Sequence, residues 1–420
     1  MIADVAVVGG GPAGAAAAVV AARAGLDVVV LDKARFPRDK ICGDGLTTGA
    51  LRLLDELGLD PTTVASWQPV TDMSVQSPSG HTVRFPLPEG PGLYAAVARR
   101  ADLDAAVVDL ARNAGARVLE GHEVTDASHP SADRIRLRAI GPDGPVVVDA
   151  RYAIAADGMW SPMRKHLGAA VPGYLGEWHA FRQYFHHVAP SAADELHVWF
   201  EPDILPGYVW SFPLPGGGAN VGFGVHRGGK VPVPAMKRLW PDLLGRPAIR
   251  AVLGEAATPE GPHRAWPIPA RVDTVALSAG RCLFVGDAAA ACDVMSGEGI
   301  GQALLTGVLA ADAVVATGPD DHHLAATRYQ EAVRHHFVAD HRMSSLLVRA
   351  LRHRKGARAA VRVAGATAWT RRNFARWLWE DYPRAVVVTP GRWRPGLFHG
   401  PGAFDATGAS VPAGVRTPTP

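Results

Sequence analysis

The stretch Ala3-Asp4-Val5-Ala6-Val7-Val8-Gly9-Gly10-Gly11-Pro12-Ala13-Gly14 decides the fold of this chain. Its first half is largely apolar, as in a buried strand, and the alanine-rich segment that continues to about Gly25 predicts a helix. Between them, Gly9, Gly11 and Gly14 have Gly-x-Gly-x-x-Gly spacing. The first permits a tight turn, the second lets a pyrophosphate approach the backbone, and the third lets helix and strand pack closely. We therefore expect the first strand–helix unit of a parallel sheet that binds a dinucleotide.

A second apolar strand, Val28 to Leu31, ends at Asp32. An acid at this place accepts hydrogen bonds from an adenosine ribose and disfavours a 2′-phosphate, so FAD or NAD fits better than NADP. The pyrophosphate is expected on free N–H groups at the positive end of the helix, near Pro12 and Ala13. Lys33 completes the expected contacts of this unit. A glycine-rich turn without a ligand is the alternative for an isolated motif, but here strand, helix and Asp32 agree.

Three later segments favour a flavin over a nicotinamide. Arg100 opens a predicted helix, Asp157-Gly158 follows a strand, and Gly286-Asp287 follows a late buried strand. FAD is long and needs separate contacts along its length, and Asp287 is suited to hold a ribityl hydroxyl. The turn from Gly297 to Gly299 and the helix that begins at Ile300 can face the pyrimidine edge, where a positive helix end stabilises reduced flavin. The sequence therefore predicts FAD as the cofactor.

In this order, the four segments resemble the single-Rossmann flavoproteins of para-hydroxybenzoate hydroxylase type. Within that superfamily the chain is similar to the geranylgeranyl reductase family. The narrower resemblance lies in residues 36–46, residues 207–213 with 222–224, and residues 371–378 with 381–383 and 389–390. The middle stretch, Gly207-Tyr208-Val209-Trp210-Ser211-Phe212-Pro213, matches the family's Tyr-x-Trp-x-Phe-Pro signature, which lines the prenyl cavity. One departure is Val294, where the family usually has a proline, and it concerns the substrate side more than the cofactor.

The resemblance spans about residues 3–395 and implies an α/β fold. It implies a single Rossmann-type FAD domain, an antiparallel β-sheet substrate domain and a helical C-terminal region. The expected ranges are 1–70, 95–170 and 276–340 for the FAD domain, 71–94 and 171–275 for the substrate domain, and 341–400 for the helical region. Residues 401–420 are small, polar and rich in proline and glycine, and are expected to be disordered.

The resemblance also implies a prenyl reductase that saturates C=C bonds of an isoprenoid or lipid by hydride transfer from reduced FAD. Tyr208, Trp210 and Phe212 alternate on a strand, so they share one face and suit a polyene. An ordinary sheet core is the alternative, but the resemblance favours a cavity. Cys42 and Gly43 fall where the family faces the flavin, and Cys42 can donate a proton or only shape the pocket. The expected catalytic residues are Cys42, Tyr208 and Trp210.

Other activities share this fold. A flavin-dependent monooxygenase, hydroxylating or epoxidising its substrate, is the main alternative. A halogenase is disfavoured because its Trp-x-Trp-x-Ile-Pro element is replaced by residues 208–213. A non-catalytic flavoprotein is the third candidate. Because a second Gly-x-Gly-x-x-Gly is absent from the sequence, NAD(P)H is expected to dock transiently, or a ferredoxin or flavin reductase delivers the electrons.

Composition excludes several classes. The 420 residues carry a formal net charge of +3, which does not suggest nucleic acid as a partner. Cys42, Cys282 and Cys292 have neither disulfide-framework nor metal-site spacing, so a cytoplasmic setting is expected. Adjacent histidines do not form a convergent set, and no metal is expected. We expect neither a secretory signal nor a membrane-spanning helix.

A basic segment follows near the C-terminus. From Arg342 to Arg376 there are ten Lys or Arg residues and no acids, with large apolar side chains interleaved. Such a segment can rest on anionic lipid as a peripheral membrane contact. Equally, it can be the solvated face of helices that pack on the flavin domain.

Overall fold

A central sheet carries the first glycine-rich turn. The computed structural model describes residues 1–87, 94–319 and 321–393. The sheet has the order β17-β18-β11-β1-β2-β8, and β1 pairs in parallel with both β2 and β11. These strands are β1 (Ile2–Val8), β2 (Val28–Asp32), β8 (Arg117–Glu120), β11 (Gly144–Ala155), β17 (Ser278–Ala279) and β18 (Cys282–Phe284). The valines of β1 and β2 are almost wholly buried, as expected of parallel strands covered on both faces.

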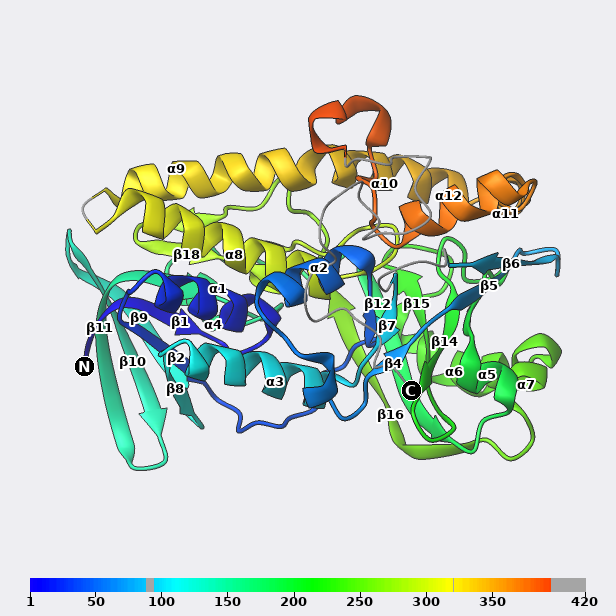
Figure 1. Ribbon diagram of the computed structural model, residues 1–420, viewed down its shortest axis with the longest axis horizontal. Coiled ribbons are helices and arrows are strands. Elements are labelled where there is room, and N and C mark those ends of the chain that lie inside the picture. Colours follow the sequence, from blue (N-terminus) through cyan, green and yellow to red (C-terminus); the bar gives the residue numbers. More distant parts are fainter. Residues whose placement is uncertain (88–93, 320, 394–420) are drawn as a thin grey trace.

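Helices α1 (Pro12–Arg23), α3 (Arg100–Asn113), α8 (Ile300–Thr317) and α9 (His322–Val333) pack around this sheet (Figure 1). Small residues let α8 approach α1, because a Cβ on Gly307 would lie 2.1 Å from the carbonyl oxygen of Ala13. Among the described residues, α8 is long and apolar enough to cross a membrane, and 56% of it is buried within the protein. Its packing against α1 explains why α8 is apolar, because α8 is a core helix of this domain.

The second sheet is mostly antiparallel and has the order β16-β12-β15-β14-β13-β5-β6. Its strands are β5 (Asp72–Gln76), β6 (Thr82–Pro86), β12 (Trp178–His186), β13 (Leu196–Trp199), β14 (Val209–Leu214), β15 (Gly218–His226) and β16 (Thr258–Ile268). Strands β5 and β6 form a hairpin that turns at residues 78–80. A second hairpin pairs Gly141 with Gly144 and extends the first sheet through β10 (Arg134–Gly141) and β9 (Glu123–Ser131).

The remaining elements are short. A three-stranded sheet joins β3 (Gly45–Leu46), β7 (Ala96–Val97) and β4 (Gln68–Pro69) between the two larger sheets. The short helices are α2 (Thr48–Glu56), α4 (Pro162–His166), α5 (Pro190–Asp194), α6 (Met236–Gly245) and α7 (Pro247–Leu253).

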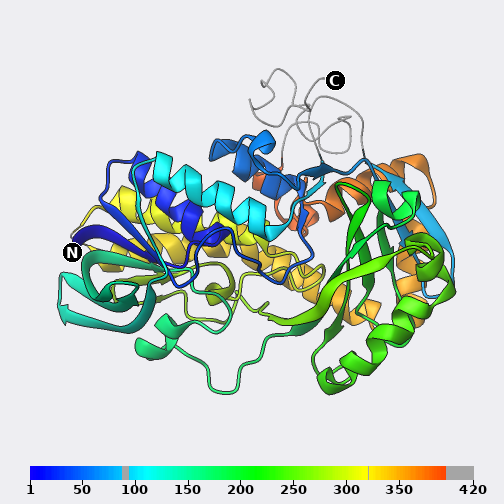
Figure 2. The same ribbon diagram turned by 90° about the horizontal axis from the view of Figure 1, so that it is seen from below.

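The C-terminal helices bridge both sheets. Helix α9 continues through a π-helical turn, Arg334–Val338, into α10 (Ala339–Leu351), and α11 (Arg354–Ala364) and α12 (Ala368–Leu378) follow. Figure 2 shows the orange helices lying beside the green second sheet, and the rings of Phe85 on β6 and Phe374 on α12 are 4.9 Å apart.

The predicted architecture of a Rossmann-type domain, an antiparallel second sheet and a helical C-terminal region is confirmed. The domain ranges stay a prediction, and the boundary expected at 340/341 falls inside an unbroken helical run. The expected disordered tail, 401–420, and residues 394–400 lie outside the described residues.

Candidate active site

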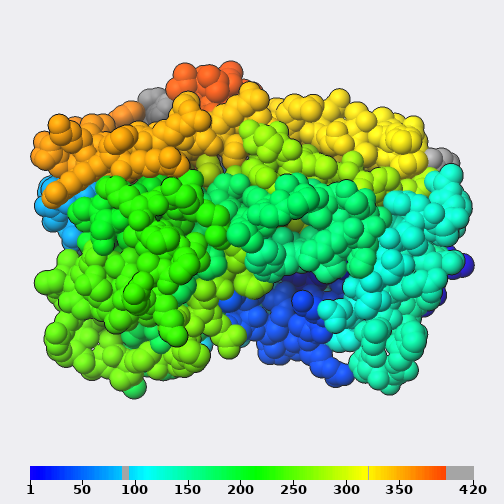
Figure 3. All heavy atoms as spheres, turned by 180° about the vertical axis from the view of Figure 1, so that it is seen from behind, coloured from blue at the N-terminus to red at the C-terminus, as the bar shows by residue number. Residues whose placement is uncertain are grey.

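One elongated cavity of about 920 Å³ runs between the two sheets. Figure 3 shows the blue, N-terminal part of the chain recessed between the green and cyan lobes on one face. The cavity reaches from Gly11 at the start of α1 to Phe374 and Trp377 on α12. All the residues predicted to bind cofactor or substrate line it, except Gly14. They are Gly9, Gly11, Pro12, Ala13, Asp32, Lys33, Cys42, Gly43, Arg100, Asp157, Gly158, Gly286, Asp287, Gly297, Gly299, Ile300, Tyr208, Trp210 and Phe212.

The glycines of the first turn serve two purposes. Gly9 has a φ of +99°, and a Cβ there would lie 2.3 Å from the carbonyl oxygen of Ala156. A Cβ on Gly14 would lie 1.9 Å from the carbonyl oxygen of Gly9, so Gly14 acts in packing rather than at the cavity wall. Gly11 precedes α1 without a side-chain cap, which leaves the first N–H groups of the helix available to an anion.

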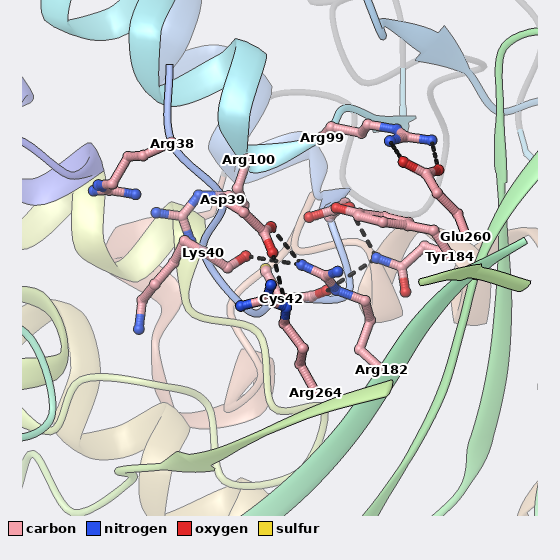
Figure 4. Close-up of polar contacts among 12 residues, drawn as sticks. Arg38, Asp39, Lys40, Cys42, Arg99, Arg100, Arg182, Tyr184, Glu260 and Arg264 are labelled. Carbon is pink, nitrogen blue, oxygen red and sulfur yellow. Dashed lines mark hydrogen bonds and ion pairs between the residues drawn. The ribbon is translucent and has the colours of Figure 1, made fainter. Parts of the chain in front are cut away.

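Two guanidinium groups strengthen this anion site. Asp104, which is fully buried, accepts hydrogen bonds from Arg100 at 2.6 and 2.8 Å and from Arg38 at 2.8 Å. Two cations therefore share one carboxylate, and the net charge beside α1 is positive. A Cβ built on Gly11 would lie 3.6 Å from Arg38 and 3.9 Å from Arg100. Arg100 is one of the predicted cofactor contacts, whereas Arg38 was not predicted, although it lies in residues 36–46, which carry part of the family resemblance (Figure 4).

The three predicted aspartates are held in different ways. Asp32 accepts hydrogen bonds from the N–H groups of Gly10 at 2.7 Å and Ala34 at 2.8 Å, which fixes its carboxylate at the end of β2. Asp157 accepts from Ser161 at 2.7 Å and from the Met163 N–H at 2.8 Å, so its carboxylate fixes the turn that holds Gly158. Burial raises the pKa of Asp157.

Asp287 lies at the middle of the cavity, near Lys40. The Lys40 ammonium is 3.9 Å from the Asp287 carboxylate and 3.7 Å from the centre of the Trp266 ring. Desolvation lowers the pKa of Lys40. The sequence analysis missed Lys40, whose only sign in the sequence is its place in the basic stretch before Cys42.

Arg182 on β12 pins the loop that carries Cys42. It donates to Asp39 at 2.7 Å and to the carbonyl oxygens of Lys40 and Cys42, each at 3.3 Å (Figure 4). Burial raises the pKa of the Cys42 thiol to about 11. The thiol is therefore protonated at neutral pH.

Asp44, two residues further, is fully buried with a φ of 66°. It accepts hydrogen bonds from Tyr184 at 2.6 Å and Asn220 at 2.8 Å. Burial raises the pKa of Asp44 to about 6, although Arg182 and these two donors oppose the shift.

The predicted aromatic residues form one wall opposite this loop. The ring centres of Tyr208 and Trp210 are 6.0 Å apart, and those of Trp210 and Phe212 are 6.1 Å apart. Trp210 donates to Asn220 at 3.1 Å, and the Tyr208 hydroxyl donates to the Ser296 carbonyl oxygen. All three residues line the cavity, which supports the expected cavity wall, although Phe212 also packs against the core of the second sheet.

The C-terminal helices close the far end of the cavity with apolar side chains. These are Leu347, Leu351, Val361, Phe374, Trp377, Leu378 and Trp379. Other apolar residues of the same region face outward, with Leu346 57%, Val363 66% and Trp369 54% exposed. The basic segment thus has two apolar faces, one of which belongs to the cavity.

A protein-family model described as an FAD binding domain matches residues 2–311. The chain belongs to this FAD-binding family. It is 36% identical over 369 residues to the menaquinone reductase of Mycolicibacterium smegmatis, which covers 82% of this chain and 84% of that protein. It is 30% identical over 335 residues to digeranylgeranylglycerophospholipid reductase 2 of Methanopyrus kandleri, covering 78% and 81% of the two.

The fold is similar to that of a geranylgeranyl bacteriochlorophyll reductase-like protein from Thermoplasma acidophilum. The TM-score is 0.76, the identity is 22%, and the match covers 93% of this chain and 99% of the other. The predicted resemblance to the geranylgeranyl reductase family is confirmed, and the protein is an FAD-dependent oxidoreductase.

The residues present fit FAD, the cofactor of this FAD-binding enzyme. The side-chain-free surface of Gly11, the start of α1 and the cations of Arg38 and Arg100 suit a pyrophosphate. Asp32 suits the adenosine ribose, since each carboxylate oxygen keeps a further lone pair. Among the described residues, no group of three or more His, Cys, Asp or Glu side chains could hold a metal.

Proposed function

We propose that this enzyme saturates C=C bonds of an isoprenoid chain attached to a quinone or lipid. The observation that carries the proposal is the continuity of the cavity. Its Gly11 end is lined by cations and backbone N–H groups, and its far end by apolar side chains of α10, α11 and α12. A long apolar chain fits the second half when the cofactor fills the first. The relatives named as menaquinone reductase and digeranylgeranylglycerophospholipid reductase support this substrate class.

The position of each predicted site residue, in the Gly11 half or the apolar half of the cavity, indicates its proposed role. The cofactor half comprises Gly9, Gly11, Pro12, Ala13, Asp32, Lys33, Arg100, Asp157, Gly158, Gly286, Asp287, Gly297, Gly299 and Ile300, and Gly14 packs behind it. Bound FAD in its reduced form supplies a hydride. Tyr208, Trp210 and Phe212 bind the prenyl chain and hold an alkene in place, since an isolated alkene is a poor hydride acceptor and depends on positioning.

Cys42 and the aromatic wall complete the proposed catalytic set. The Cys42 thiol lies in the loop that faces Trp210 and Phe212. A Cβ built on Gly45 in this loop would lie only 3.1 Å from the Phe212 ring, so glycine lets the ring pack closely against the loop. Cys42 either donates a proton or shapes the pocket. Tyr208 fixes the turn before α8 through Ser296, and Trp210 excludes water from the alkene.

The electron donor and the membrane contact are part of the same proposal. The second large sheet of the described chain is mostly antiparallel and is therefore not a further Rossmann unit for NAD(P)H. This supports transient docking of NAD(P)H, or delivery of the electrons by a ferredoxin or flavin reductase. The exposed cations of α11 support peripheral contact with an anionic membrane from the cytoplasmic side.

Anaerobic incubation of the photoreduced enzyme with geranylgeranyl lipids or a polyprenyl quinone tests this function. We expect flavin reoxidation together with a product about 2 mass units heavier, one added H₂ per bond. Reoxidation that requires oxygen and adds one oxygen atom would establish the monooxygenase instead, and halide-dependent substitution would establish the halogenase. Protein that neither carries FAD nor takes it up would contradict every flavoenzyme interpretation.

A further inference from the structure

An acid that the sequence analysis passed over lies in the turn before α8. Glu298 stands between Gly297 and Gly299, and its half-buried side chain lines the cavity. One carboxyl oxygen, Oε1, accepts hydrogen bonds from the N–H groups of Ile300 at 3.0 Å and Gly301 at 2.9 Å. The carboxyl group therefore sits at the positive end of α8, where its anionic form is stabilised after a proton leaves.

A second carboxyl group meets the same face of α8. Glu380 follows α12 and accepts hydrogen bonds from Thr47 at 2.9 Å and from Gln302 at 2.8 Å. Gln302 lies in the first turn of α8, which directly follows the turn that holds Glu298. Glu380 has a φ of 61°, and Arg384 approaches it at 3.5 Å. The C-terminal segment thus brings a buried acid against the start of α8.

Charge in this cluster is unbalanced. Glu380 and Asp293 share the guanidinium of Arg384, which lies 3.5 Å from Glu380 and 3.8 Å from Asp293. The pKa of Asp293 is lowered by Arg384 and Ser296 despite its burial, so Asp293 is the ionised member. Burial and the negative charge of Glu380 raise the pKa of Glu298 to about 8, against the N–H donors and Arg384. Burial raises the pKa of Glu380 as well, so the two carboxyl groups together retain a proton at neutral pH.

Glu298 also lies close to the predicted catalytic residues. Tyr208 donates to the carbonyl oxygen of Ser296, two residues before Glu298, and Glu298, Cys42 and Tyr208 all line the cavity. An acid whose pKa lies near neutral pH transfers a proton more readily than a thiol whose pKa is about 11.

We propose that Glu298 is the general acid of the reaction and that Glu380 is a positioning residue that keeps Glu298 protonated. This inference rests on the proposed function. The hydride from reduced FAD forms a C–H bond with one alkene carbon. The O–H bond of Glu298 then breaks and a C–H bond forms at the other carbon, so one hydride and one proton saturate the double bond. The Glu298 carboxylate remains hydrogen-bonded to Ile300 and Gly301 and regains its proton from water after product release.

The test is a single turnover of the reduced, FAD-loaded enzyme with a geranylgeranyl lipid under anaerobic conditions. Glu298→Gln keeps the Oε1 acceptor and removes the proton, and we expect reoxidation on the order of 100-fold slower. Glu298→Asp should restore part of the rate, and Glu331→Gln, an exposed glutamate of α9 that does not line the cavity, should leave it unchanged. Glu380→Gln should move the alkaline limb of the pH–rate profile to lower pH, because the charge that raises the pKa of Glu298 is gone. A merely structural role for Glu380 would leave that limb in place.

A readout independent of turnover is the infrared band of a protonated carboxyl group at pH 7. We expect this band to weaken in Glu298→Gln and to titrate near pH 8 in the unmodified enzyme. If Glu298→Gln turns over at the unmodified rate, or the band does not change, Glu298 is not the acid while the proposed function stands. If the unmodified enzyme reduces no prenyl substrate, the proposed function and this role fall together. If the Glu298→Gln variant does not bind FAD, the turnover rate of Glu298→Asp and the infrared band of the unmodified enzyme test the role of Glu298 instead.

Discussion

Arg38 and Arg100 are bound to the same carboxylate, that of Asp104, although they lie on a loop and a helix 62 residues apart in sequence. The carboxylate orients both guanidinium groups toward Gly11. Its single negative charge balances only one of them, so one positive charge remains. Burial of Asp104 makes this orientation costly to lose, because a charge buried without its partner is strongly destabilising.

Asp104→Asn is therefore expected to weaken FAD binding by about 10-fold or more, since the two arginines lose their common acceptor and repel each other. Fluorescence titration of the apoprotein with FAD measures this. Asp109→Asn on the same helix removes an exposed partner of Arg112 and should leave the affinity unchanged. Equal affinities of the Asp104 variant and the unmodified protein would contradict the proposed pyrophosphate site.

Chain-length preference should depend on the cavity-facing side of α10. Leu351→Trp fills the apolar end, so we expect a several-fold loss of rate with the longest prenyl chains and little change with short ones. Leu346→Trp on the same helix is the matched control, because Leu346 is exposed and does not line the cavity. Competition between chains of different length, analysed by mass spectrometry, measures the preference. A similar shift in both variants would contradict the assignment of this end to the prenyl chain.

Asp44 should make the stability of the protein depend on pH. Because folding raises its pKa from 3.8 to about 6, the protonated form is favoured in the folded state. Its contribution is fully present below pH 3.8 and is lost as pH rises through about 6. Asp44→Asn removes this penalty at pH 7, and we expect a gain on the order of 2–3 kcal/mol relative to its effect at pH 4.

Urea unfolding of both proteins between pH 4 and pH 8 measures that difference. Asparagine tolerates the positive φ of residue 44 and can still accept from Tyr184. A stability difference that is constant over this range would show that Asp44 is ionised throughout.

The two interpretations of the basic segment differ in their effect on lipid binding. Replacing Arg354, Lys355 and Arg358 on α11 by glutamate should abolish co-sedimentation with vesicles rich in phosphatidylglycerol if this face meets the membrane. Binding of the unmodified protein should fall with added salt and be weak on phosphatidylcholine. The triple change Lys230→Glu, Lys237→Glu and Arg238→Glu on the second-sheet lobe is the control. Unchanged sedimentation of the α11 variant would show that this face does not meet the membrane, and would support its interpretation as the solvated face of packed helices.

Local sequence patterns predicted most of the first half of the cavity. Gly9 and Gly14 leave no room for a Cβ, and Gly11 keeps the start of α1 free of a side chain, so their spacing already specifies a strand, a turn and a helix. The aromatic alternation at Tyr208, Trp210 and Phe212 likewise follows from the two-residue period of a strand. Resemblance to a known family then gave these patterns a cofactor and a substrate class.

What the sequence by itself determined was the half of the cavity around Gly11, because the turns there depend on backbone conformations encoded within a few residues. Only the tertiary structure decided that Arg38 joins Arg100 at Asp104, that Lys40 lies between Trp266 and Asp287, and that Glu380 reaches Gln302 at the start of α8. These contacts link residues tens to hundreds of positions apart. Their energies depend on burial and on shared charges, and neither quantity exists until the chain has folded.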